Sequence, residues 1–131
     1  LSAVGIPDPK ERMRSYAHEM SGGMVQRVVI AMALVCRPGV VLADEPTSGL
    51  DVTIQDQVLR LFRSLVSKTG ASALLVTRDM GIVANFCDRV GVMDNGRLIE
   101  VVRVADIFSG AVQPQTKALL AAASLNEKQV F

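Results

Sequence analysis

The chain has 131 residues and a formal net charge of +1, with 14 Lys and Arg residues against 13 Asp and Glu. That length suffices for one domain to bury a core without disulfides or metals. The balanced charge leaves no broad basic surface for nucleic acid or anionic lipid. Half of the residues are apolar and only 4% are aromatic, so we expect an aliphatic core of the kind found in layered α/β proteins.

The cysteines and the hydropathy indicate a reducing compartment and no membrane span. Cys36 and Cys87 are too few for a disulfide scaffold, and because both lie in apolar stretches we expect buried, reduced thiols. The most apolar stretch, 28–43, is interrupted at 37–39 and falls short of the roughly 18 apolar residues that a span needs. The sequence starts at Leu1 without an initiator Met or leader, so we expect a chain that lacks its front part.

The first third of the chain predicts a loop, a helix and a strand. Residues 1–20 carry glycine, prolines and charges, which favour a loop and a short polar helix that add little to the core. Residues 24–36 are helix formers that are apolar on nearly every side, which predicts a buried helix. Residues 40–43 form a short apolar run that ends at Asp44 and Glu45, as expected of a strand covered on both faces of a parallel sheet.

The remaining segments continue the alternation of helices and strands. Asp51 suits the N-cap of a helix whose apolar residues recur at three- and four-residue spacing until Gly70. The later elements are a second buried strand over 71–77, a helix over 80–86, a strand over 89–93, a hairpin turn at Asp94-Asn95-Gly96, a strand over 97–102 and a helix over 114–124 with an apolar side of Ala118, Leu119, Leu120 and Ala122. This order predicts an α/β fold with a mainly parallel sheet and flanking helices.

Ser21-Gly22-Gly23 stands directly before the first long helix. A hydroxyl group, unpaired backbone N–H groups and the positive end of the helix dipole favour an anion, and the two glycines let a ligand approach the chain. The alternative is a serine N-cap followed by a flexible glycine pair.

Asp44 and Glu45 end the first predicted strand, and ligands of open parallel sheets bind outside the carboxyl ends of strands. Adjacent side chains of a strand point to opposite faces, so the two acids suit different tasks. One carboxylate can hold Mg²⁺ through water while the other orients and deprotonates an attacking water. The alternative is a solvated acidic turn before Pro46.

Three segments in order, 21–27, 42–51 and 77–79, resemble the carboxyl-terminal half of an ABC-transporter ATPase subunit, a P-loop NTPase-type fold. The resemblance implies the following roles: Ser21 to Gln26, with Gly22, Gly23 and Met24, as the nucleotide-contacting signature motif, Val40 to Asp44 as the Walker B strand, Glu45 as the catalytic glutamate, Ser48 to Asp51 as the D-loop, and Arg78 at the H-loop position.

Over almost its whole length the chain also resembles a narrower group, the oligopeptide, dipeptide and nickel importer ATPases. The matching segments are 4–9, His18-Glu19, 30–34, 51–55, Ile107-Phe108 and 114–120. This likeness implies three regions: the end of a helical subdomain and linker (1–20), a core with the signature, Walker B, D-loop and H-loop (21–104), and an importer-type tail (105–131).

The family likeness implies that two ATPase subunits enclose two ATP molecules head to tail. Ser21, Gly22 and Gly23 would contact the γ-phosphate of ATP held by the partner, and Asp51 would lie at the seam between subunits. Glu45 would be the general base and Asp44 the Mg²⁺ carboxylate. The resemblance also implies permease subunits in the membrane, a cytoplasmic protein peripheral to the inner face of the cell membrane, and import of peptides or nickel.

Two departures from the family pattern leave open whether this chain takes part in ATP hydrolysis. The sequence has no G-x-x-x-x-G-K-[ST] phosphate loop, so ATP and Mg²⁺ would require a P-loop from outside this chain, and we expect the chain alone to be inactive. Arg78 stands where the family has a histidine, and a guanidinium cannot switch its charge as an imidazole does. The alternatives are a non-catalytic, degenerate half-domain acting as a scaffold or trans-acting partner, and a soluble ABC protein of DNA repair or translation, which the importer-like tail and the near-zero charge disfavour.

Overall fold

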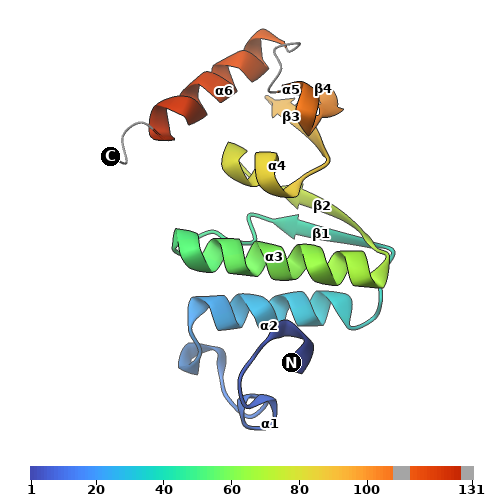
Figure 1. Ribbon diagram of the computed structural model, residues 1–131, viewed down its shortest axis with the longest axis vertical. Helices are drawn as coiled ribbons and strands as arrows, with labels where there is room; N and C mark the ends of the chain where they lie inside the picture. Colours follow the sequence, from blue (N-terminus) through green and yellow to red (C-terminus); the bar gives the residue numbers. More distant parts are fainter. Residues whose placement is uncertain (108–112, 128–131) are drawn as a thin grey trace. The chain divides into compact units, whose positions relative to one another are not determined.

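The computed structural model describes residues 1–107 and 113–127, which belong to two compact units, Leu1–Val76 and Thr77–Phe131. Each unit has its own two-stranded sheet, parallel in the first and antiparallel in the second. The α/β class expected from the sequence is confirmed, with helices beside a parallel pair of strands (Figure 1). The three regions expected from the motifs remain a prediction.

Three short helical turns open the first unit: η1 (Ser2–Val4), α1 (Pro9–Arg12) and η2 (Ala17–Glu19). The expectation that residues 1–20 add little to the core is wrong, because Val4 is only 2% exposed and Ile6 is buried as well. The carbonyl of Val4 accepts a hydrogen bond from Nη1 of Arg27 at 3.2 Å. Isolated apolar residues between turn formers can thus anchor a segment that has no long element of its own.

The rest of the first unit consists of two helices and two strands: α2 (Gly22–Leu34), β1 (Val40–Asp44), α3 (Val52–Thr69) and β2 (Ser72–Val76). The strands are parallel and in register from Val40 opposite Ser72 to Asp44 opposite Val76. Both strands point toward the end at which α2 and α3 begin (Figure 1). The core joins both helices to β1 and contains Ile30, Leu34, Val41, Val58 and Phe62.

Helix α3 follows the sequence expectation closely. Asp51 caps its start, and Gly70 ends it in the left-handed conformation with φ of 71°. Val58 and Phe62 from the predicted periodic set are buried in the core. On its exposed side, Nε of Arg60 donates to Oδ2 of Asp56 at 2.7 Å, and this hydrogen bond to a carboxylate raises the pKa of Arg60.

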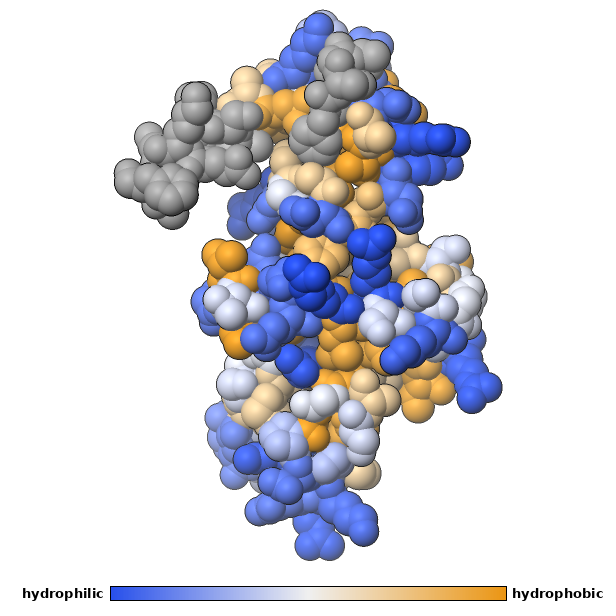
Figure 2. All heavy atoms as spheres, in the orientation of Figure 1, coloured by the Kyte–Doolittle hydropathy of each residue, from blue (hydrophilic) through white to orange (hydrophobic). Residues whose placement is uncertain are grey.

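Burial in this unit is lower than the apolar runs predict. The apolar run over 24–36 predicts a buried helix, yet in α2 only Ile30 and Leu34 are buried, while Met32 is exposed. Strand β1 was expected to be covered on both faces, but Leu42 is 73% exposed, and β2 is also largely exposed. Alternation along a strand directs Val41 into the core and its neighbour to the opposite face, so apolar side chains remain on the surface, as the visible face in Figure 2 shows.

The second unit contains α4 (Met80–Phe86), β3 (Arg89–Asp94), β4 (Arg97–Arg103), α5 (Val104–Ile107) and α6 (Pro114–Glu127). The hairpin turn is confirmed: Asn95 and Gly96 have φ of 47° and 75°, and two left-handed residues match the twist of a tight hairpin. The predicted helix over 80–86 is confirmed with the same bounds.

The predicted tail helix exists as α6, but within residues 114–122 the predicted apolar side is not the buried one. Leu119 is 48% exposed, whereas Thr116 is fully buried. Oγ1 of Thr116 donates to Oε2 of Glu100 at 2.7 Å, and the backbone N–H of Gln113 donates to the same oxygen at 3.2 Å. The first turn of α6 is therefore attached to β4 by polar contacts. Phe108, part of the tail likeness, lies outside the described residues.

Both cysteines lie in the described part of the chain, and neither forms a disulfide. The expectation of two buried thiols is wrong for Cys36, which is exposed just after α2 ends, while Cys87 is partly buried. Among the helices in 1–107 and 113–127, none is long and apolar enough to cross a membrane.

Candidate functional site

Ser21 caps α2 at the end toward which the strands of the first unit point. Its Oγ accepts a hydrogen bond from the backbone N–H of Met24 at 3.4 Å, and its carbonyl accepts one from Val25 at 3.0 Å. The N-cap interpretation of the sequence is therefore confirmed. Ser21 and Gly22 are exposed, so the positive end of the helix dipole is at the surface, and a role in anion binding stays a prediction. Met24 and Gln26 are partly buried.

The two glycines have a packing role that the sequence did not reveal. A Cβ atom on Gly23 would lie 2.6 Å from Cγ2 of Ile54, and one on Gly22 would lie 3.1 Å from Cδ2 of Leu50. Glycine thus allows the start of α2 to approach the first turn of α3 and the turn before it. Nothing in the sequence pattern indicates this contact, because it joins residues that are distant along the chain.

Asp44 and Glu45 lie at the carboxyl end of β1, where ligands of parallel sheets commonly bind. Asp44 is exposed and pairs with Val76, and the backbone N–H of Glu45 donates to the carbonyl of Val76 at 2.9 Å. Glu45 has φ of 39° and precedes Pro46. Left-handed backbone is costly for a residue with a side chain, and proline further restricts the residue before it. The structure therefore holds Glu45 in a strained conformation.

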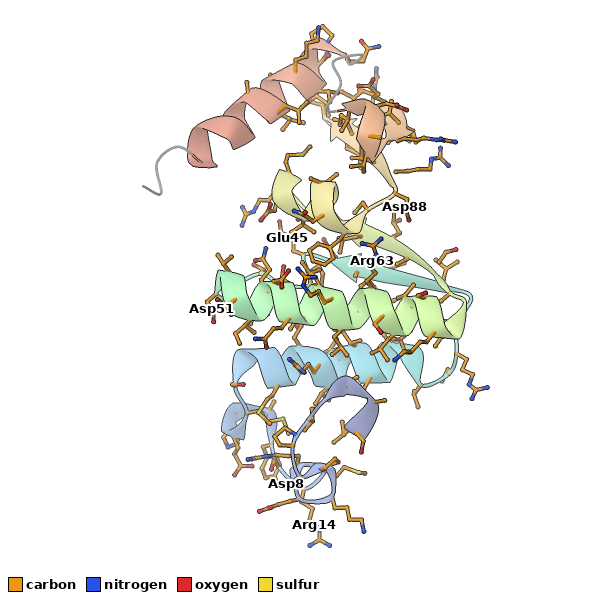
Figure 3. All side chains as sticks on the ribbon, viewed as in Figure 1. Asp8, Arg14, Glu45, Asp51, Arg63 and Asp88 are labelled. Carbon is orange, nitrogen blue, oxygen red and sulfur yellow. The ribbon has the colours of Figure 1, made fainter. Side chains whose placement is uncertain are left out.

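The turn from Ser48 to Asp51 connects the segment of Glu45 to α3. Figure 3 shows Asp51 at the start of this helix. The N–H of Ser48 donates to the carbonyl of Glu45 at 3.0 Å. Oδ1 of Asp51 accepts the N–H of Ile54 at 3.0 Å. Asp51 therefore has a structural task as N-cap, and its role at a subunit seam stays a prediction.

Arg78 lies in the second unit, in the segment between β2 and α4, and is exposed. The next residue, Asp79, caps α4 by accepting the N–H groups of Gly81 and Ile82 at 2.8 and 3.2 Å. Arg78 is thus placed just before a well-capped short helix, and its function at the H-loop position stays a prediction.

Arg27 is a residue that sequence reasoning left without a role. Its Nη1 donates to the carbonyl of Val4 at 3.2 Å, and its Nη2 donates to Oε1 of Gln57 at 3.3 Å. A Cβ on Gly5 would lie 2.8 Å from Nη1. Arg27 therefore connects the amino-terminal segment, α2 and α3, and its signal in the sequence is a cation at the border of a long apolar run.

The carboxylates at the end of β1 can supply a metal ion with a single protein ligand but not with a complete set. Within the residues that the structure describes, no group of three or more His, Cys, Asp or Glu side chains is placed to hold a metal. Mg²⁺ in nucleotide sites is bound through one or two carboxylates together with waters and substrate phosphates. The exposed carboxylate of Asp44 fits that requirement as a single ligand, with the others supplied by nucleotide and water.

Known proteins share both the sequence and the fold of this chain. The family model described as ABC transporter matches residues 1–48. The dipeptide transport ATP-binding protein DppD of Bacillus subtilis (strain 168) is 54% identical over 120 residues, which are 92% of this chain and 36% of that protein. The chain therefore resembles the ATP-binding subunits of ABC transporters. Its relatives include dipeptide and oligopeptide transport ATP-binding proteins, as the motifs and the tail predict.

Two further similar proteins extend the comparison. The oligopeptide transport ATP-binding protein OppD of the same organism is 50% identical over 121 residues, covering 92% of this chain and 34% of that protein. A solved structure, the dimeric post-hydrolysis state of the ATP-binding cassette MJ0796 bound to ADP and Pi, has a TM-score of 0.65 and 26% identity over 79% of this chain and 43% of that chain. The chain thus spans about a third of the length of the curated relatives it matches.

Proposed function

We propose that this chain supplies the hydrolytic carboxylates and the signature segment of a shared ATP site, in a protein that energises peptide import. The importer assignment is supported by the likeness to the dipeptide and oligopeptide transport proteins. Its reaction is the hydrolysis of ATP to ADP and phosphate. The observation that carries the proposal is that Asp44 and Glu45 lie at the carboxyl end of a parallel strand, at the end of the unit where α2 begins after its N-cap Ser21.

Glu45 acts as the general base in this proposal. A carboxylate beside the γ-phosphate orients a water molecule and removes its proton as the oxygen attacks phosphorus. The hydrogen bonds that its backbone makes to Val76 and Ser48 fix its position at the end of β1. Asp44 holds Mg²⁺, which neutralises charge on the phosphate oxygens when bound.

Ser21, Gly22 and Gly23 act as the phosphate clasp for ATP bound to a second ATPase subunit. A helix N-terminus stabilises an anion by roughly 0.3–1 kcal/mol when exposed and up to about 2 kcal/mol when partly buried. The rest of the free energy of phosphate binding comes from direct hydrogen bonds to the phosphate oxygens. The dimeric structure of MJ0796 bound to ADP and Pi supports an arrangement of two subunits around nucleotide.

The proposed assembly includes permease subunits in the membrane and a second ATPase subunit that is identical or related. The P-loop comes from outside the sequence of this chain, because no segment of it has the required glycine and lysine spacing. In this proposal the chain is a peripheral component at the inner face of the cell membrane.

The test is the Glu45→Gln variant of the ATPase that contains this chain. Glutamine keeps the shape of the side chain and removes the base, so we expect turnover to fall by about 10²–10⁴ with nucleotide affinity unchanged. Asp88→Asn is a matched control, since that carboxylate lies in the second unit just before β3, and it should leave turnover intact. Hydrolysis at the normal rate by Glu45→Gln would refute the assignment of the base.

The second candidate function is a non-catalytic scaffold or trans-acting partner that keeps the dimer surface without turnover. The fixed charge of Arg78 at the H-loop position and the lack of a P-loop in this sequence favour it. ATP hydrolysis that depends on Glu45 decides between the two.

A further inference from the structure

The first turn of α2 lies unusually close to the first turn of α3. A Cβ atom built on Gly23 would be 2.6 Å from Cγ2 of Ile54, a separation that real Cβ atoms essentially never show. Cγ2 is bonded directly to the β-carbon of isoleucine, so it moves only if χ1 or the helix backbone changes, and β-branched residues in helices keep one strongly preferred χ1. Gly23 is therefore required by packing.

The backbone of Gly23 itself does not require glycine. It lies within α2, outside the set of residues with positive φ. At such helical positions alanine is normally the more stabilising residue. Because of the contact with Ile54, Gly23→Ala should destabilise the protein, whereas Gly→Ala within a helix usually stabilises it.

Gly22 makes a weaker version of the same contact. Its Cβ would lie 3.1 Å from Cδ2 of Leu50, which is the flexible end of a side chain and can yield by a small rotation. Leu50 directly precedes Asp51, the N-cap of α3. The segment 21–23 is thus packed against the turn 48–51 as well as against the helix that follows it.

We propose that these two contacts join the Ser21–Gly23 segment, the Ser48–Asp51 turn and the first turn of α3 into one packed block, so that a displacement of the turn together with the start of α3 displaces the signature segment of the same subunit. Ile54 and Leu50 are positioning residues in this block. The inference rests on the proposed function where it connects the phosphate clasp with the subunit seam, while the block itself is a property of the fold.

The first experiment is a double-mutant cycle on thermal unfolding of the polypeptide that carries this sequence. Gly23→Ala should lower Tm by about 3–10 °C, as overpacking does. In the Ile54→Ala background the same substitution should leave Tm unchanged or raise it, because the opposing Cγ2 is gone. An equal change of Tm in both backgrounds would overturn the proposal.

A matched control tests whether any truncation in the first turn of α3 has the same effect. Val52 lies two residues before Ile54 and is 81% exposed, so Val52→Ala should not relieve Gly23→Ala. If Gly23→Ala does not fold, the cycle of Gly22→Ala with Leu50→Ala replaces it, with a smaller shift of the same sign expected. Rescue by Val52→Ala, or no coupling in the second cycle, would count against the block.

The second experiment measures ATP turnover of the same variants in the complete ATPase. Gly23→Ala should lower kcat by at least about tenfold, and Ile54→Ala should restore most of that loss in the double variant. If Gly23 were needed only for the approach of phosphate, the double variant would keep the lowered kcat of Gly23→Ala, which would refute the mechanical link. Lack of turnover in the unmodified protein would refute the proposed function, and the thermal cycle would still decide on the block.

Discussion

Ser21 and Asp51 perform the same task at the starts of two neighbouring helices. Oγ of Ser21 accepts the N–H of Met24 at 3.4 Å, and Oδ1 of Asp51 accepts the N–H of Ile54 at 3.0 Å. Both caps lie at the end of the first unit toward which β1 and β2 point (Figure 1). The residues that the family likeness assigns to nucleotide and partner contacts are thus also the residues that define where α2 and α3 begin.

Replacing Asp51 by alanine should destabilise the first unit. Loss of an N-cap side chain costs about 0.5–2 kcal/mol, because the N–H of Ile54 loses its acceptor. Asp51→Asn keeps an oxygen at the same place and should cost much less. Urea unfolding measures both variants, and equal stability of Asp51→Ala and the unmodified chain would contradict the capping role.

The hydroxyl of Thr116 should be more important to α6 than the apolar residues of that helix. Thr116→Val keeps the volume and removes the donor to the partly buried carboxylate of Glu100, which should cost about 1.5–3 kcal/mol because a hydrogen bond to a charged group is lost. Thr116→Ser keeps the hydroxyl group and should retain slow amide exchange at Gln113. Hydrogen exchange of the first turn of α6 distinguishes them, and identical protection in all three proteins would disprove the polar attachment.

Arg27 should control the order of the amino-terminal segment. Arg27→Met removes both of its hydrogen bonds, to Val4 and to Gln57, whereas Gln57→Ala removes only one. We expect faster proteolysis within residues 1–20 for Arg27→Met than for Gln57→Ala, since only the first substitution releases Val4. Unchanged cleavage rates would show that burial of Val4 and Ile6 is sufficient to hold the segment.

Arg78→His restores the residue type that the family places at the H-loop position. If the proposed ATP site is active, an imidazole able to exchange a proton should raise turnover, by up to about 10²-fold, the lower end of the range for general acid–base groups. Arg78→Gln, which is neutral and cannot titrate, is the control. A higher kcat for both variants would indicate that only removal of the positive charge matters.

The sequence predicted the elements well where the signals were local. The Asp51 cap, the Gly70 stop and the Asn95-Gly96 turn each depend on residues within a few positions, and all three are present. Exposure of Leu42 was missed because burial of an apolar run depends on which elements cover it. The contact of Gly23 with Ile54 was missed because two elements must fold before these residues meet.

The sequence predicted which residues form the candidate site more readily than it predicted their conformations and contacts. The carboxylates at the end of β1 follow from an apolar run that ends in two acids. The positive φ of Glu45 had no signal in the sequence, since glutamate before proline ordinarily favours extended backbone. The polar attachment of α6 was also unexpected, because a threonine in a helix with several apolar residues gives no sign that it is the buried one among residues 114–122.

The central claim is that this chain supplies the hydrolytic acid and the phosphate clasp of an ATP site whose P-loop comes from outside its sequence. The most direct measurement is steady-state ATP hydrolysis by this chain alone and together with a P-loop-bearing ATPase partner, for the unmodified chain and for Glu45→Gln. The account predicts no turnover by the chain alone and turnover with the partner that Glu45→Gln abolishes. Hydrolysis by the chain alone, or turnover with the partner that is indifferent to Glu45→Gln, would contradict it.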